Sequence, residues 1–306
     1  MKPKKKAKSA TRIDAQIIAG SKKQEWLVPI LLLLPSLVLF IAFTGYPFVR
    51  TIFNSFAVTT TGGEFIRWAG FANWKRTFLN PQLLSSLKNT FILAGLSLAM
   101  TFIPAMFLAL LAAGRGKGSR FYQTLYALPM AFAAAPVAAI WIFIFRQDSG
   151  LLNQALGTDI AWIRDTKYAL IAVAIASSWG RIARASLYLL VGFKNVSDEV
   201  IEAADIDGAG WWTKTFKIMI PLASPQIFYV LFLKVIESLK TFATIDLLTG
   251  GGPAGATTTL MYSIYERATG ANQIEMACCE ALILFVVIFV ITRIQLKFGE
   301  KFVFYQ

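Results

Sequence analysis

The sequence predicts an all-α membrane protein that crosses the bilayer six times. Hydrophobic residues make up 56% of the 306 residues and charged residues only 15%, whereas charged residues are about a quarter of a soluble domain. Apolar runs of spanning length, which is about 20 residues, alternate with short polar segments. Basic residues gather in the N-terminal tail and in alternate loops, as the positive-inside rule describes for cytoplasmic segments. This pattern is typical of a polytopic membrane protein.

The N-terminus is a basic tail followed by the first apolar run. Residues 1–26 contain eight Lys or Arg and two acidic residues, so we expect a solvated cytoplasmic tail or one that contacts lipid head groups. The run 27–46 is longer than the apolar core of a signal peptide, which is about 7–15 residues. We therefore expect it to be an uncleaved first span.

The other spans follow from the apolar runs in chain order. They are expected at 90–113, 122–145, 168–192, 223–248 and 273–295. The loops 50–88, 146–167 and 249–272 are then outside, and the loops 115–120 and 193–222 are inside. This gives a membrane domain at 27–298 and a short tail at 299–306, with both termini cytoplasmic.

Several function classes are excluded by what the sequence lacks. There is no histidine, which removes histidine acid–base chemistry and histidine metal sites. The adjacent Cys278 and Cys279 lie in an apolar run and fit neither a disulfide framework nor a metal site. The segment Gly116–Ser119 lacks the Ser or Thr that follows Gly-Lys in a phosphate loop. We expect no enzyme, no cofactor and no metal in this chain, and no nucleic-acid partner despite the net charge of +13.

The inner loop 193–222 is predicted to hold two short helices. Ser197 or Asp198 can cap the first, and Gly208 and Gly210 suit a left-handed turn that ends it. Trp212 and Phe216 lie one turn apart and give the second helix an apolar face. Pro221 is expected to stop that helix. The loop predicts a docking element, with an ordinary amphipathic hairpin as the alternative.

Charged residues inside the predicted spans are candidates for a solute path, because such residues are costly in a membrane. Arg181 and Arg184 share one face of the fourth span, near Trp179, which can stack on a sugar ring. The alternatives for the arginines are snorkelling to the cytoplasmic surface and pairing with a second subunit. Cations in a cavity would favour an anionic or strongly hydroxylated solute.

The fifth span adds three further charged candidates. Lys234, Glu237 and Thr241 follow one helical face, and Lys240 lies three residues beyond Glu237. The alternative for Glu237 with either lysine is an ion pair that only satisfies itself.

The inner loop also carries a family resemblance. Glu202-Ala203-Ala204, then Gly208, then Ile218 and Pro221 resemble the signature of permease subunits of bacterial ABC importers, with Ile220 where leucine is usual. The resemblance is to the sugar-type, maltose-permease-like branch, and within it most of all to glycerol-3-phosphate permeases. It extends to Gly118–Leu125, Ala139–Phe143, Gly150–Asn153, Thr249–Pro253 and Ala256–Tyr262. It implies a type I importer permease fold with a cytoplasmic coupling helix.

The resemblance implies a set of partners in a bacterial plasma (inner) membrane. These are a second, related permease, two ATPase subunits that bind ATP and Mg, and an extracytoplasmic solute-binding protein. Glu202, Ala203, Ala204, Gly208, Ile218 and Pro221 would dock the ATPase.

The implied function is import of a carbohydrate or polyol phosphate by alternating access, with a solute like glycerol 3-phosphate favoured. A neutral sugar or oligosaccharide is the alternative. A more distant one is a secondary transporter or channel that uses Arg181, Glu237 and Glu275 as an ion path.

Overall fold

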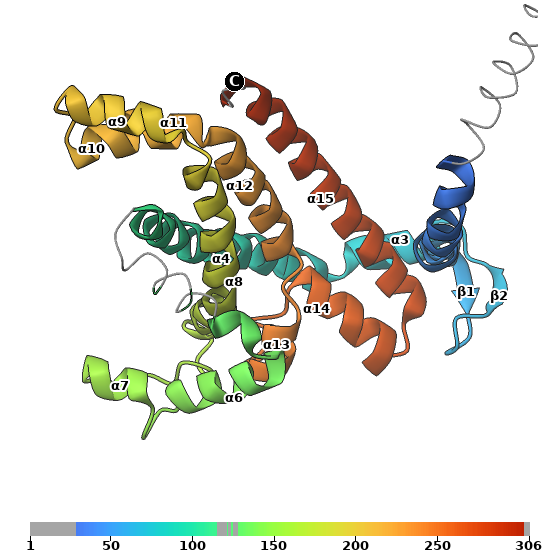
Figure 1. Ribbon diagram of the computed structural model, residues 1–306. Coiled ribbons are helices and arrows are strands. Elements are labelled where there is room, and N and C mark those ends of the chain that lie inside the picture. Colours follow the sequence, from blue (N-terminus) through green and yellow to red (C-terminus); the bar gives the residue numbers. More distant parts are fainter. Residues whose placement is uncertain (1–28, 115–120, 122–123, 125–127, 303–306) are drawn as a thin grey trace, which may run out of the picture. The chain divides into compact units, whose positions relative to one another are not determined.

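The computed structural model describes residues 29–114, 121, 124 and 128–302, with side chains up to residue 299 (Figure 1). Within these ranges the regular structure is helical except for one two-stranded hairpin. Residues 1–54 and 55–306 form two compact units, which are treated separately below. The predicted tail 1–26 lies outside the described residues, and so does most of the tail 299–306.

The first unit contains one long apolar helix. It runs over Pro29–Ser55, has a mean hydropathy of 2.1 and confirms the first predicted span, although it continues past residue 46. It includes the π-helical turn η1 (Ile41–Gly45) and ends in α2 (Tyr46–Ser55). The turn η1 comes just before Pro47, which has no N–H to donate. Tyr46 donates instead to the carbonyl of Ile41, five residues back.

The predicted outer loop 50–88 contains local secondary structure. Strands β1 (Ala57–Thr59) and β2 (Phe65–Trp68) pair antiparallel, and α3 (Ala72–Leu79) follows. Helix α4 (Pro81–Ala113) begins nine residues before the second predicted span, because the Asn80 side chain accepts a hydrogen bond from the Gln82 amide at 2.9 Å. Proline also suits the first helical position.

The third predicted span, 122–145, is not seen as one long helix. Residues 122–123 and 125–127 lie outside the described part of the chain. The described part contains the 3₁₀ turn η2 (Leu128–Ala131) and the apolar helix α6 (Ala134–Ile144) of 11 residues. Among the described residues, four helices are long and apolar enough to cross a membrane, or up to five if a bent pair counts as one.

The remaining predicted spans differ in how well they match. Helix α8 (Ala169–Lys194) confirms the fourth, and α15 (Ile274–Phe302) confirms the sixth and extends it. The fifth was expected as one helix over 223–248, which is wrong. The chain forms α12 (Ser224–Leu239) and α13 (Ala243–Leu248), with a break at residues 240–242.

Short helices occupy the connecting segments at both ends of α8 (Figure 1). The segment before α8 contains α7 (Leu151–Leu156), and the segment after α13 contains α14 (Leu260–Tyr265) and the π-helical turn η4 (Glu266–Gly270). The segment after α8 contains α9 (Asp198–Ile206), α10 (Trp211–Thr213), the π-helical turn η3 (Lys214–Met219) and α11 (Ile220–Leu222).

The core of the second unit is the packing of α4 along α8, with α12 against both. Small residues line the contact: Ala105, Ala109 and Ala112 of α4 are fully buried, as is Ala185 of α8. Small side chains let helix backbones approach closely inside a membrane, where apolar lipid gives little drive for association. Hydrogen bonds add to this contact, since Ser178 Oγ donates to the carbonyl oxygen of Ser97 at 3.3 Å.

The glycine-rich loop 249–259, which was expected to turn on the outer side, is hydrogen-bonded to α4. The Asn89 side-chain amide donates to the carbonyls of Gly255 and Thr258, both at 3.1 Å. Thr257 is fully buried and donates to the carbonyl of Gly252 at 2.7 Å. Internal hydrogen bonds therefore satisfy several backbone carbonyls of this loop.

The crossing of α8 and α12 depends on one glycine. A Cβ at Gly192 would lie 2.5 Å from Gln226 Cβ and 2.7 Å from Gln226 Cγ. We expect Gly192→Val to push the helices apart and to destabilise the chain by about 1–3 kcal/mol, the usual cost of overpacking. A lower melting temperature of the purified protein in detergent is the readout.

Gly95→Val is the matched control, because a Cβ at Gly95 of α4 meets nothing within 4 Å. Equal melting temperatures for the two variants would contradict the close approach at Gly192.

Candidate functional site

A cavity of about 270 Å³ brings together residues from η2, α6, α8, α12 and α13. It contains four of the six residues predicted for the solute path, namely Trp179, Arg181, Arg184 and Glu237. Its size suits a small solute, since ligand pockets for drug-sized molecules begin at about 300 Å³. The cavity therefore unites residues that are more than 50 positions apart in the chain.

An ion-pair network holds α8 to α12 beside this cavity. The Arg184 guanidinium lies 3.1 Å from Glu237 Oε1, and Lys234 Nζ lies 2.6 Å from Glu237 Oε2. The Lys234 side chain is only 4% exposed, so water cannot solvate its ammonium group and the Glu237 carboxylate compensates the charge instead. The sequence-based expectation that Glu237 pairs with a lysine of the same helix is confirmed for Lys234.

Arg181 reaches the break between α12 and α13. One of its terminal nitrogens donates to Thr241 Oγ1 at 2.9 Å and lies 3.5 Å from the Glu237 carbonyl oxygen. The last carbonyls of a helix have no partner within it, so a guanidinium from α8 supplies a donor there. Both arginines point across to α12, and neither snorkels toward the end of α8.

Three sequence-based expectations about this cluster need correction. Lys240 is exposed at the C-terminal cap of α12 and is not among the residues that line the cavity. Thr241 does not continue the helical face of Lys234 and Glu237, because α12 ends at Leu239. Glu275, which the ion-path alternative joined to Arg181, accepts a hydrogen bond from the Thr59 amide at 2.7 Å instead.

Aromatic side chains form another part of the wall. Phe132, just after η2, lies with its ring centroid 6.0 Å from that of Trp179, and Trp141 of α6 also faces the cavity. Thr244 of α13 was missed because a continuous fifth helix would place it elsewhere. Phe132 was also missed, because no motif in the sequence singles it out.

Three cations and one carboxylate meet at this site, so it carries a surplus of positive charge. Arg181, Arg184 and the Glu237 carboxylate line the cavity. Lys234 does not line it and lies buried behind Glu237, with which it pairs. Guanidinium groups bind carboxylates and phosphates through short, charge-assisted hydrogen bonds. The arrangement is suited to hold an anion and contains no nucleophile poised beside a base.

The second predicted site, the loop 193–222, begins with a capped helix. Ser197, and not Asp198, caps α9, because its side chain accepts from the Glu199 amide at 3.2 Å. Gly208 has φ +74° and confirms the left-handed turn. Gly210 does not share it: with φ −66° it caps the start of α10 in extended geometry.

Pro221 does not stop the second helix as expected. The helix continues from Trp211 to Leu222 and bends by 71° into the next one at Ala223. The π-helical turn η3 makes this possible, because the Ile220 amide donates to Thr215, five residues back. As before Pro47, a widened turn accommodates the missing proline N–H.

Large apolar side chains are exposed on this loop. Ile206 is 86% exposed and Trp212 is 69% exposed, and the rings of Trp212 and Phe216 stack with centroids 5.5 Å apart. An ion pair between Lys214 and Asp205 joins η3 to α9. Glu202 and Ala203 lie on α9, and Ala204 is its buried residue. The loop thus presents an apolar surface.

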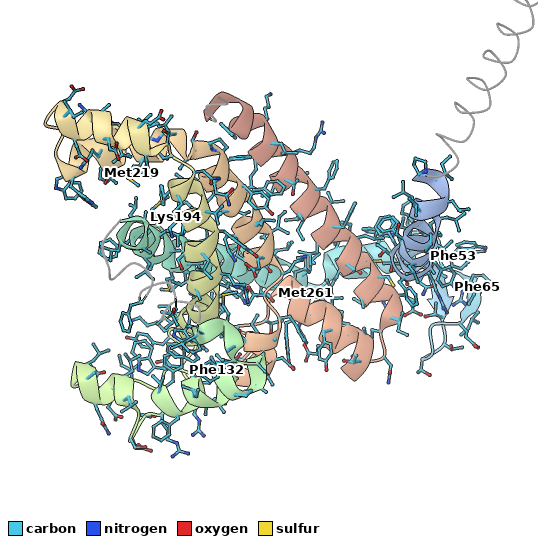
Figure 2. All side chains as sticks on the ribbon, viewed as in Figure 1. Phe53, Phe65, Phe132, Lys194, Met219 and Met261 are labelled. Carbon is cyan, nitrogen blue, oxygen red and sulfur yellow. The ribbon has the colours of Figure 1, made fainter. Side chains whose placement is uncertain are left out.

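Helix α8 separates this loop from the cavity. Arg184 and Lys194 are ten residues apart, which is about 15 Å along a helix. Figure 2 shows the two regions, with Phe132 labelled beside α6 and Met219 labelled on the loop that contains α9–α11.

Comparison with known proteins identifies the family of this chain. Residues 105–302 match the family described as binding-protein-dependent transport system inner membrane component. The sn-glycerol-3-phosphate transport system permease protein UgpA of Yersinia pestis is 34% identical over 285 residues, which cover 92% of this chain and 96% of that protein. The protein of the same name from Escherichia coli O157:H7 is 32% identical over 288 residues, covering 93% and 97%.

Solved structures show the same fold. A chain of a bacterial ABC transporter involved in the import of the acidic polysaccharide alginate superposes with a TM-score of 0.80 at 23% identity, covering 93% of this chain and 98% of that one. The same type of transporter in complex with an alginate-bound periplasmic protein gives a TM-score of 0.77 at 22% identity, covering 90% and 94%. This chain has the fold of an ABC importer permease and belongs to the family of binding-protein-dependent inner-membrane transport components.

Proposed function

We propose that this chain is one of two permease subunits of an ATP-driven importer of an organic phosphate, with glycerol 3-phosphate as the favoured solute. The observation that carries the proposal is the cavity lined by Arg181 and Arg184. Its one lining carboxylate, Glu237, is already paired with Arg184 and with the buried Lys234. The relatives that are 32–34% identical are named for sn-glycerol-3-phosphate transport, and the structural neighbour imports an acidic polysaccharide. Both kinds of solute are anionic, as the charge of the cavity requires.

In this proposal the chain crosses the bacterial inner membrane six times, with both termini in the cytoplasm. Helix α6 belongs to the third span, and α12 with α13 contributes the fifth. The loop 193–222 then faces the cytoplasm, and the segment 146–167 faces outside. The 26 residues of α8 are about 39 Å long at 1.5 Å per residue, which is enough to separate the two faces.

The partners are those of an importer that uses an external binding protein. A second, related permease completes the path, and two ATPase subunits bind ATP and Mg on the cytoplasmic side. Glu202, Ala203, Ala204 and Gly208 dock into an ATPase subunit through α9, and the segment containing Ile218 and Pro221 links this element to α12. Closure of the ATPases moves the loop, and the spans change between inward-facing and outward-facing states.

A neutral sugar is the second candidate solute. The aromatic pair Trp179 and Phe132 at the cavity wall favours it, because aromatic faces stack on sugar rings. The cationic side of the same cavity favours a solute that also carries a negative group. A sugar phosphate would use both parts of the wall.

The solute assignment predicts the effect of Arg184→Gln. Loss of the guanidinium that faces the cavity should raise the KM for glycerol 3-phosphate uptake by about tenfold, since a hydrogen bond to a charged group contributes about 1.5–3 kcal/mol. Uptake by cells or proteoliposomes that contain the whole transporter is the measurement.

Lys240→Gln is the matched control, because it also removes one positive charge, but Lys240 lies at the C-terminal cap of α12 and does not line the cavity. An equal loss in both variants, or wild-type uptake of neutral sugars only, would refute an anionic solute bound at Arg184.

The coupling assignment predicts the effect of Gly208→Val. At φ +74° a β-branched residue is strained although nothing lies within 4 Å of the added Cβ, so the end of α9 should distort. We expect uptake to fall at least tenfold while membrane insertion is retained, because the ATPase no longer receives a correctly shaped loop.

Gly210→Val is the control in this case, since Gly210 has an ordinary φ of −66° and also has open space. ATP hydrolysis and uptake are measured together in proteoliposomes. Uptake that is normal in Gly208→Val, or full uptake by this chain without an ATPase, would refute the coupling role.

A further inference from the structure

We propose that the Glu237 carboxylate is a built-in counter-anion of the cavity, which the solute's anionic group displaces from Arg184. This inference rests on the proposed function, because it takes the cavity as the solute path. Among the described residues that line the cavity, Glu237 is the only acidic one. Its two oxygens bind two different cations, Arg184 at 3.1 Å and Lys234 at 2.6 Å.

The two cations differ in how easily they can exchange a partner. The Lys234 side chain is 4% exposed, so water cannot replace the Glu237 carboxylate at its ammonium group. Lys234 therefore keeps Glu237 as its partner. The Arg184 side chain is 40% exposed and faces the cavity. An incoming anion can therefore replace Glu237 at Arg184 while Glu237 stays with Lys234.

Arg181 supplies a second contact for that anion. Its NH2 group donates to Thr241 Oγ1 at 2.9 Å, but its NH1 group is buried without a hydrogen-bond partner. Leaving a buried donor without an acceptor costs free energy, and a solute oxygen that accepts from it removes that cost and so binds more tightly. Arg181 and Arg184 lie one turn apart on α8, so a phosphate with several oxygens can accept from both.

The competition makes Glu237 a residue that determines specificity. A neutral hydroxyl cannot displace a carboxylate from a guanidinium, because hydrogen bonds between charged partners are about twice as strong as neutral ones. A phosphate can, since it carries more charge and more acceptor oxygens. Glu237 also weakens solute binding, because it pairs again with Arg184 when the solute leaves. Re-formation of this ion pair favours release of the solute.

The test uses the complete transporter in lipid nanodiscs without the external binding protein. Inorganic phosphate and glycerol 3-phosphate are titrated by calorimetry into wild type and Glu237→Gln. Glutamine has the same size, and its amide oxygen still accepts from Lys234, but it lacks the competing charge. We expect the Kd for both ligands to fall about tenfold or more. In proteoliposomes that also contain the external binding protein, we expect the saturated uptake rate to fall because release is slower.

Glu266→Gln is the control, because Glu266 is exposed on η4 outside the cavity, and we expect it to leave both Kd values unchanged. A Glu237→Gln transporter that assembles and binds phosphate no more tightly than wild type would overturn the inference.

Should this variant not assemble, Glu237→Asp replaces it. The shorter carboxylate withdraws from Arg184, so tighter phosphate binding supports the inference and unchanged binding overturns it.

The outcome is separate from that of the proposed function. If wild type takes up no organic phosphate with its binding protein, the proposed solute is wrong. Tighter binding of inorganic phosphate to Glu237→Gln would still support the displaced counter-anion.

Discussion

The central constraint in this structure is the buried ammonium group of Lys234. A side chain that is 4% exposed among apolar helices needs a counter-charge within reach, and Glu237 provides it from the same helix. The second oxygen of Glu237 then attracts Arg184 of α8. One buried cation thus fixes the register of α12 against α8 and places two arginines at the cavity wall. Packing of small residues along α4 and α8 brings the backbones close enough for these contacts.

The same two helices carry both candidate sites. Helix α8 ends at Lys194, α12 begins at Ser224, and the loop between them holds α9, α10, η3 and α11. They pack tightly where the loop leaves them, since a Cβ at Gly192 would collide with Gln226. A force applied to the loop therefore acts on the elements that carry Arg184 and Glu237. In the proposed importer, this connection relates ATPase closure to the state of the solute cavity.

The helix interruptions follow one physical rule, which is that every freed backbone group finds another partner. Before Pro47 and before Pro221, a π-helical turn lets the preceding amide donate five residues back. At the end of α12, the donor comes from Arg181 on another helix. In the glycine-rich loop, Asn89 of α4 supplies two donors. Such a partner matters most at the break after α12, within the fifth predicted span, because a bilayer offers no water to complete the backbone hydrogen bonds.

The sequence by itself determined the class of the protein, four of the long helices, the left-handed turn at Gly208 and the family. These depend on composition, apolar runs and local backbone chemistry, which act within a few residues. Only the tertiary structure decided that the fifth predicted span breaks at residues 240–242 and that Lys234, and not Lys240, pairs with Glu237. It also brought Phe132 and Thr244 to the cavity. These features depend on groups from α8 and η2 that are distant in sequence, and a helical pattern does not say which faces meet.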